Sequence, residues 1–248
     1  MIIEILRHKR NSDTSFFQQF EYRYEDENET VATMLNKLNL HEELRDINGK
    51  IADKIAFKQS CLQKKCGACA MLINGRPELA CGKRLAEFGD HLRLEPLKKF
   101  PVVEDLIVDR TIMSENLKLV NAYMTGEAII DEKRNELSYE AGRCLQCGCC
   151  LEVCPNFAAD NGFTGMAAAM PLSRIINESD KADLKEISGR YNKYVYEGCG
   201  KSLSCVDICP AKIRIEDLLV NSNAIAIWKR FMRKCWTMKR SMARLQTG

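Results

Sequence analysis

The spacing of apolar and polar positions in the first 80 residues predicts a small sheet with one helix. Residues 2–6 (IIEIL) and 16–24 (FFQQFEYRY) fit two strands of a hairpin, the second alternating apolar with polar side chains. Apolar residues within 31–38 recur at helical spacing. Residues 70–79 (AMLINGRPEL) fit a strand and turn, because Asn-Gly is a strong turn signal. This order predicts a β-grasp-like α+β domain.

The pattern becomes helical after a connector marked by proline. The connector runs from Pro96 to about Asp109, and Glu104-Asp105 within it, like the acidic run at 25–29, is expected to be exposed to solvent. No internal repeat is expected. The overall fold class is α+β, with domains at 1–100 and 111–248 joined by residues 101–110. The clearest helical segments of the second domain are 114–124, 165–176 and 214–228.

Composition narrows the possible functions. The net charge of +3 over 248 residues does not indicate a nucleic-acid partner. The N-terminus lacks the pattern of a targeting peptide, and the longest uncharged run, 161–173, is short of the roughly 20 apolar residues that span a membrane. Thirteen cysteines in a protein of the reducing cytosol are expected to bind metal rather than to form a disulfide scaffold.

The first cysteine block has the spacing C-x4-C-x2-C-x11-C. Its opening C-x4-C-x2-C is the plant-type [2Fe–2S] spacing, and Gly67 and Ala68 are small enough for the backbone to approach a cluster. A zinc site would use paired C-x2-C knuckles, and this block has one such pair. The predicted [2Fe–2S] ligands are Cys61, Cys66, Cys69 and Cys81.

Two later blocks follow the ferredoxin run C-x2-C-x2-C-x3-C-P. The run 144–155 is complete, whereas the run 199–210 has Ser202 in its second cysteine position. In two-cluster ferredoxins the fourth cysteine of a run binds the other cluster. We therefore predict a [4Fe–4S] site and a three-thiolate site. The ligands of the first are Cys144, Cys147, Cys150 and Cys209, and those of the second are Cys154, Cys199 and Cys205.

The three-thiolate site is expected to hold [3Fe–4S]. Serine is a hard, weakly acidic ligand, so Ser202 should bind a fourth iron poorly. The alternative is a four-iron cluster with water or an alkoxide on its unique iron. A zinc-stabilised interaction module is the alternative from another functional class, and it is disfavoured by the run 144–155.

The remaining candidates carry no expected chemistry. Cys149 is expected to be a packing residue near a cluster, and Cys235 lies in the C-terminal tail. The three histidines (His8, His41 and His91) are expected to be surface or packing residues. Neither a phosphate-binding loop nor a nucleophile elbow nor a Rossmann fingerprint occurs, so the chain is expected to have no substrate site or catalytic residue of its own.

These motifs resemble the iron–sulfur subunits of succinate dehydrogenase and fumarate reductase over nearly the whole chain. The block around Cys66 to Cys81 resembles the family form CGxCAMxINGxxxLAC, and residues 101–109 (PVVEDLIVD) resemble its interdomain connector. The C-x5-C-x3-C-P of residues 199–210 is similar to its three-iron arrangement. The resemblance implies a β-grasp [2Fe–2S] domain followed by a mostly α-helical domain with [4Fe–4S] and [3Fe–4S] clusters.

The resemblance also implies partners and a location. Electrons would pass between a flavoprotein subunit, which holds FAD and the dicarboxylate, and a quinone near the three-iron cluster at a membrane anchor that can carry haem b. The chain would be a peripheral subunit on the cytoplasmic side of a bacterial membrane, held by these partners. The alternative is an electron-transfer subunit of a soluble flavoprotein reductase that acts on another enoate.

The sequence departs from the family at the quinone end. Many members carry a tryptophan and a histidine where this chain has Ala159 and Gly200. The tail from Trp228 to Leu245 contains seven Lys or Arg and no acidic residue, and it is expected to form a basic amphipathic helix. Such a helix could lie on anionic lipid or pack on a partner subunit, and the sequence supports both readings equally.

Overall fold

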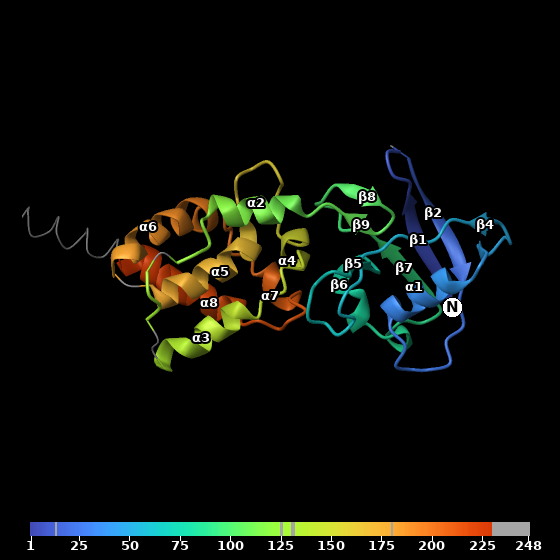
Figure 1. The fold of residues 1–248 in the computed structure, drawn as a ribbon, viewed down its shortest axis with the longest axis horizontal. Helices are drawn as coiled ribbons and strands as arrows, with labels where there is room; N and C mark the ends of the chain where they lie inside the picture. Colours follow the sequence, from blue (N-terminus) through green and yellow to red (C-terminus); the bar gives the residue numbers. More distant parts are fainter. Residues whose placement is uncertain (13, 125, 130–131, 180, 230–248) are drawn as a thin grey trace, which may run out of the picture.

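The computed structural model describes residues 1–12, 14–124, 126–129, 132–179 and 181–229. It is elongated, with a sheet-containing lobe at one end and a helical lobe at the other (Figure 1). Residues 230–248, and with them Cys235 and most of the expected basic helix, lie outside the described residues. In the described part of the chain no helix has the length and apolar character needed to cross a bilayer.

The N-terminal lobe is built on a mixed sheet with the order β2-β1-β7-β5-β6. The hairpin of β1 and β2 is antiparallel, β1 and β7 are parallel, and β5 is antiparallel to both β6 and β7. A second, two-stranded sheet pairs β3 with β4. The strands are β1 (Ile2–His8), β2 (Ser15–Glu21), β3 (Leu44–Arg45), β4 (Ile51–Ala52), β5 (Ala70–Ile73), β6 (Arg76–Leu79) and β7 (His91–Glu95).

Helix α1 (Val31–Leu40) packs on this sheet as predicted. The side chain of Thr30 accepts a hydrogen bond from the Thr33 amide at 3.2 Å and so caps the helix N-terminus. Its apolar face, which includes Met34 and Leu35, is fully buried in one core with Ile3 of the sheet. The acidic run at 25–29 is exposed except for Glu29, which binds the Tyr22 hydroxyl and Lys37. The expectation that the whole run is exposed to solvent was therefore wrong at Glu29.

The connector is a folded element rather than an extended linker. It contains a small hairpin of β8 (Val102–Glu104) and β9 (Ile107–Val108) that lies between the two lobes (Figure 1). Asp105, expected to be solvated, is 3% exposed at the tip of this hairpin. The expectation failed because the partner of Asp105, Arg7, lies 98 residues earlier in the chain.

The helical lobe is arranged around α5 (Gly165–Glu178), which contacts α2, α3, α4, α6 and α8. Short side chains such as Ala168 and Ala169 on α5 are fully buried and allow close packing. Each of α6 and α8 continues into a π-helical turn, at Asn192–Tyr196 and Ala224–Trp228. The other helices are α2 (Thr111–Leu119), α3 (Glu132–Gly142), α4 (Cys149–Glu152), α6 (Lys181–Tyr191), α7 (Ser204–Asp207) and α8 (Ile215–Asn223), and short 3-10 turns occur at Ala80–Gly82 and Leu85–Glu87.

Candidate iron–sulfur cluster sites

The first three cysteines of the first block lie in the loop between β4 and β5, and Cys81 follows β6, at the end of the N-terminal lobe that faces the helical lobe. Backbone amides surround the sulfurs of this block. Cys61 Sγ accepts from the Gln63 amide at 3.3 Å and the Lys65 amide at 3.4 Å, and Cys81 Sγ accepts from the Lys64 amide at 3.3 Å. Amide donors directed at sulfur are what a negatively charged cluster needs, so the loop fits the predicted [2Fe–2S] group.

Hydrogen bonding and burial act oppositely within this loop. The Gln63 and Lys65 amides lower the pKa of the half-exposed Cys61 thiol to about 7. Burial, together with the interactions with Cys81 and Cys66, raises the pKa of the Cys69 thiol to about 12. The four predicted ligands therefore interact with one another, and one side of their group is open to solvent.

Four cysteines line a cavity in the helical lobe at the side nearest the sheet. They are Cys144, Cys147, Cys150 and Cys209, the predicted [4Fe–4S] ligands. The rest of the lining is mostly apolar and includes Met170 and Ile213. Burial raises the pKa of the Cys144 thiol to about 11, so this thiol would need a bound cation or cluster to become a thiolate.

A second cavity contains the predicted three-thiolate set. Cys154, Cys199 and Cys205 line it together with Ser202, and Cys150 lines both cavities. Burial raises the pKa of the Cys205 thiol to about 11. The two cavities are similar in size, with volumes of about 20 and 30 Å³, so their difference lies in the ligands rather than in size.

The backbone repeats at a spacing of 55 residues across these two runs, contrary to the expectation of no repeat. Gln146 and Lys201 share the left-handed conformation, with φ of 50° and 56°, and Gly148 and Leu203 share it with φ of 86° and 58°. The next four residues form α4 in one run and α7 in the other. Ser202 therefore occupies the position that Cys147 occupies in the complete run.

The repeat extends to a second pair of side chains. The Cys149 thiol hydrogen-bonds the Cys147 sulfur and lowers the pKa of the Cys147 thiol to about 7. In the other run Ser204 Oγ lies 3.3 Å from Ser202 Oγ. The thiols of Cys147 and Cys149 thus correspond to the hydroxyls of Ser202 and Ser204 at equivalent backbone positions. Sequence reasoning missed Ser204, although the 55-residue offset was available as a signal.

The three sites lie next to one another. Gly67 of the first loop packs against Cys147, and an added Cβ at Gly67 would lie 2.8 Å from Cys147 Cβ. The Arg110 guanidinium, which the sequence analysis did not single out, donates to the Gly67 carbonyl at 3.0 Å. Cys150 joins the second site to the third.

Contacts from the connector fix the two lobes against each other. The amides of Lys98 and Lys99 each donate to the Glu152 carboxylate at 3.0 Å, and Lys99 Nζ donates to the carbonyls of Cys154 and Phe157. The Phe100 ring packs on the Phe157 ring with centroids 6.2 Å apart. These contacts hold the segment that carries the second and third sites.

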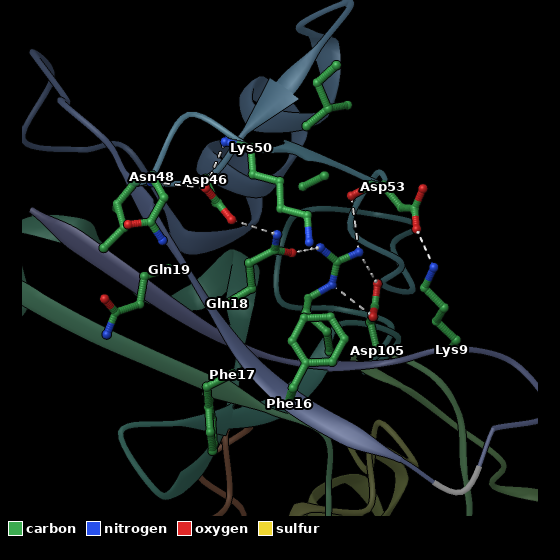
Figure 2. Close-up of a pocket in the computed structure, with 14 residues that line it drawn as sticks. Lys9, Phe16, Phe17, Gln18, Gln19, Asp46, Asn48, Lys50, Asp53 and Asp105 are labelled. Atoms are coloured by element: carbon green, nitrogen blue, oxygen red, sulfur yellow. Dashed lines mark hydrogen bonds and ion pairs between the residues drawn. The ribbon is translucent and has the colours of Figure 1, made fainter.

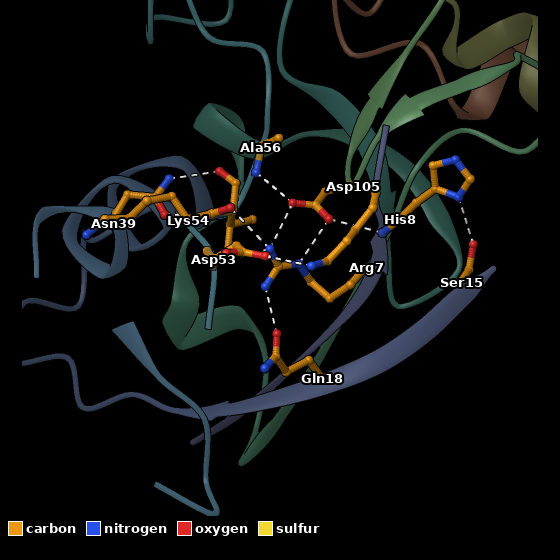
Figure 3. Close-up of polar contacts among 11 residues, drawn as sticks. Arg7, His8, Ser15, Gln18, Asn39, Asp53, Lys54, Ala56 and Asp105 are labelled. Atoms are coloured by element: carbon orange, nitrogen blue, oxygen red, sulfur yellow. Dashed lines mark hydrogen bonds and ion pairs between the residues drawn. The ribbon is translucent and has the colours of Figure 1, made fainter. Parts of the chain in front are cut away.

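The connector is also tied to the N-terminal lobe through a buried ion pair (Figure 3). Arg7 Nε and Nη2 donate to the two oxygens of Asp105 at 3.0 and 3.1 Å, and both side chains are at most 6% exposed. Asp105 also accepts from the amides of His8 and Ala56. Arg7 and Asp105 each have several hydrogen-bond partners, as a buried ion pair requires.

The hollow beside β2 and the three histidines contribute no cluster ligand. Figure 2 shows this hollow, where Gln18 donates to Asp46 at 3.3 Å and no cysteine is present. His41 and His91 are exposed, His8 is half-buried, and Cys149 is fully buried beside the second site. No three His, Cys, Asp or Glu side chains of the described residues converge closely enough to hold one metal ion.

Comparison with known proteins gives two family matches. Residues 2–115 match the 2Fe-2S iron-sulfur cluster binding domain, and residues 140–213 match the 4Fe-4S dicluster domain. The chain is 32% identical over 221 residues to the succinate dehydrogenase iron-sulfur subunit of Bacillus subtilis, covering 84% of this chain and 85% of the relative. It is 28% identical over 198 residues to the fumarate reductase iron-sulfur subunit of Haemophilus influenzae, covering 72% and 77%.

A solved structure supports the same fold. A chain of the Mycobacterium smegmatis Sdh1 complex in the apo form superposes with a TM-score of 0.72 at 23% identity, covering 92% of this chain and 96% of that chain. At this identity the likeness concerns the fold alone. It agrees with the predicted order of a [2Fe–2S] sheet domain and a helical ferredoxin-like domain.

Proposed function

The chain belongs to the family of iron–sulfur subunits of succinate dehydrogenases and fumarate reductases, and we propose that it relays electrons between a flavoprotein subunit and a membrane quinone. The observation that carries this proposal is the continuity of three cysteine sites. The first loop touches the second site through Gly67, and the second and third share Cys150. The bound clusters would accept and pass on single electrons along this row.

We propose the ligands of each cluster from the residues that each site brings together. The amide-lined loop would hold [2Fe–2S], and the cavity with four cysteines would hold [4Fe–4S]. The cavity with Ser202 would hold [3Fe–4S] through Cys154, Cys199 and Cys205. The chain's own contribution is to donate amides to sulfur, to exclude water from the two cavities and to keep the sites in contact.

The quinone end is proposed at the third site. An apolar groove beside it is lined by Tyr191, Tyr196 and Trp228, and it includes Cys199 and Lys201. Gly200 leaves room for the Asn156 side chain, which donates to the Gly198 carbonyl at 2.7 Å. Asn156 thus occupies part of the space that a residue-200 side chain would use, and the quinone would be bound by groups other than the usual tryptophan and histidine.

The proposed assembly places the chain peripherally on the cytoplasmic face of the membrane. The N-terminal lobe would face the flavoprotein with its FAD, and the third site would face an anchor that can carry haem b. The alternative is the same relay in a soluble flavoprotein reductase for another enoate. Co-purification with an integral membrane subunit supports the first, and co-purification with a flavoprotein alone supports the second.

The test is electron paramagnetic resonance on anaerobically purified protein, with iron and sulfide measured in the same sample. We expect an oxidised three-iron signal that disappears on mild reduction, followed by a [2Fe–2S] signal. An oxidised sample without that signal, with two four-iron signals on strong reduction, contradicts the role of Ser202. A colourless protein with zinc and no sulfide overturns the proposal.

A further inference from the structure

Arg110 lies at the junction of the two lobes, between the connector and α2. Its guanidinium reaches back to the first cysteine loop and donates to the carbonyls of Gly67 at 3.0 Å and Ala70 at 3.1 Å, with a longer contact to Ala68 at 3.4 Å. A fork of donors on one planar group can hold several carbonyls in fixed relative positions, which a lysine cannot do. Arg110 therefore fixes the turn between Cys66 and Cys69.

The same guanidinium acts on the second site. Its charge interacts with Cys147 and Cys149 on one side and with Cys69 and Cys66 on the other. Among the described residues no Asp or Glu forms an ion pair with Arg110, and its Nε is buried without a hydrogen-bond partner. No carboxylate of the described residues therefore neutralises the Arg110 charge, which acts on the sulfur-containing groups on either side.

The backbones of the two sites meet beside this charge. Gly67 has φ of +71°, and an added Cβ would lie 2.8 Å from both Cys147 Cβ and the Leu145 carbonyl oxygen. This approach is possible only for a residue without a side chain. Arg110 binds the carbonyl of this same glycine, so it holds the first loop at its point of closest packing on the second.

We propose that Arg110 is a positioning residue that holds the [2Fe–2S] and [4Fe–4S] sites together and raises the reduction potentials of both clusters. A fixed positive charge in a poorly solvated region stabilises the more negative, reduced form of each neighbouring cluster. Arg110 reaches the first site by hydrogen bonds and the second through the packing of Gly67 on Cys147. Among the described residues no such contact joins it to the third site, so the [3Fe–4S] potential should depend on it least. The inference rests on the cluster ligands assigned under the proposed function.

The test is a redox titration of the intact purified complex, monitored by electron paramagnetic resonance, for wild type and Arg110→Met. We expect the midpoints of [2Fe–2S] and [4Fe–4S] to move to more negative values in the variant, while the [3Fe–4S] midpoint moves least. Arg45→Met is the matched control, because Arg45 is exposed and pairs with Glu43 in the N-terminal lobe. Its three midpoints should equal those of wild type.

Two further variants separate charge from hydrogen bonding. Arg110→Lys keeps the charge and should restore most of the shift, whereas Arg110→Gln keeps a planar donor without charge and should behave like Arg110→Met. If Arg110→Met fails to assemble its clusters, the Gln and Lys variants decide the question. Equal midpoints in all variants, with all cluster signals present, overturn the inference. A wild-type protein without these signals overturns the proposed function instead.

Discussion

The cysteine loop of the N-terminal lobe and the two cavities of the helical lobe hold thiols in different ways. In the loop, amide donors lower the pKa of the Cys61 thiol to about 7 at a site that is partly open to solvent. In the cavities, burial raises the pKa of the Cys144 and Cys205 thiols to about 11. The exposed thiol of the loop is stabilised as a thiolate by backbone amides, whereas Cys144 and Cys205 depend on what fills the cavities. Each region has one exception, since the pKa of the buried Cys69 thiol is raised and that of the hydrogen-bonded Cys147 thiol is lowered.

This difference predicts how strongly folding depends on the clusters. The sheet and α1 of the N-terminal lobe bury Ile5, Phe20 and Leu35 in an apolar core that continues to Leu151 and Phe157 of the helical lobe. In the helical lobe, Cys150 and Cys209 face cavities that a cluster would fill. Because bound groups stabilise the state that binds them, the helical lobe should be the more cluster-dependent part.

The largest effect is expected from Cys209→Ser. It removes a thiolate from the four-cysteine cavity, so the [4Fe–4S] cluster should be lost. The helical lobe should lose about 4 kcal/mol or more, which a ligand held at a thousand times its dissociation constant contributes. Iron content and thermal unfolding measure both changes. Cys149→Ser is the control, since Cys149 lies in the run but outside the proposed ligands; iron loss in that variant would contradict the ligand set.

Asp105→Asn tests whether the stability of the N-terminal lobe depends on its buried ion pair rather than on its cluster. It leaves Arg7 buried without a counter-charge, so the free energy of unfolding should fall by about 3–5 kcal/mol, with cluster content per folded molecule unchanged. Chemical denaturation and iron analysis give the two values. The neighbouring pair Arg10–Glu104 is exposed, so Glu104→Gln should cost less than about 1 kcal/mol. Equal losses of unfolding free energy in Asp105→Asn and Glu104→Gln would contradict the special role of the buried ion pair.

Gly67→Ala tests the contact between the two regions. The methyl group would clash with Cys147 and would force a left-handed backbone on alanine, a cost of about 1–3 kcal/mol. The clash lies between two cluster loops, so cluster signals from both should broaden. Gly75→Ala is the control: it has a similar φ of +76° and open space around it, so it should carry the backbone cost alone. Electron paramagnetic resonance and thermal unfolding compare the two variants.

Cys61→Ser should change the fold less than Cys209→Ser does. A serine oxygen can accept the same amides of Gln63 and Lys65, and the site is partly open to solvent. The free energy of unfolding should change by less than about 1 kcal/mol, whereas the [2Fe–2S] signal should be altered or lost. A stability loss as large as that of Cys209→Ser, measured in the same denaturation experiment, would remove the contrast between the two regions.

Ser202→Cys is expected to have the smallest effect on stability and to change only the type of cluster at the third site. It restores the thiol that Cys147 provides in the complete run, so the third site should gain one iron and the oxidised three-iron signal should disappear. Quinone-linked turnover should slow. Ser204→Cys, which corresponds to Cys149, should leave the cluster type unchanged. Iron counts and spectra that do not differ between the two variants would contradict the assignment of Ser202.

Local patterns predicted the local elements well. The helical spacing of 31–38 and the Asn-Gly turn correspond to α1 and to the β5–β6 hairpin, where Asn74 and Gly75 have φ of 48° and 76°. Strand β7 was missed because the alternation of HLRLE over five residues is a weak signal. Its central place between β1 and β5 depends on pairing with residues far away in the chain.

The cysteine spacing indicated the groups of residues that the structure brings together at each site, while the supporting residues could not be predicted. Spacing predicts candidate ligands because chemistry restricts which residues bind iron. The burial of Asp105 and the role of Arg110 depend on partners about 100 and 40 residues away, and no local pattern records them. The match of Ser204 with Cys149 emerges only when the two backbones are compared.

The exchange of the fourth cysteine between the runs has a consequence for synthesis on the ribosome. With the proposed ligands, the first site is complete once Cys81 has left the ribosome, so its cluster could be inserted while translation continues. The second site waits for Cys209 and the third also needs Cys205, so both remain incomplete until the second run is exposed. Their delivery by the assembly machinery must therefore come late, and nearly at the same time.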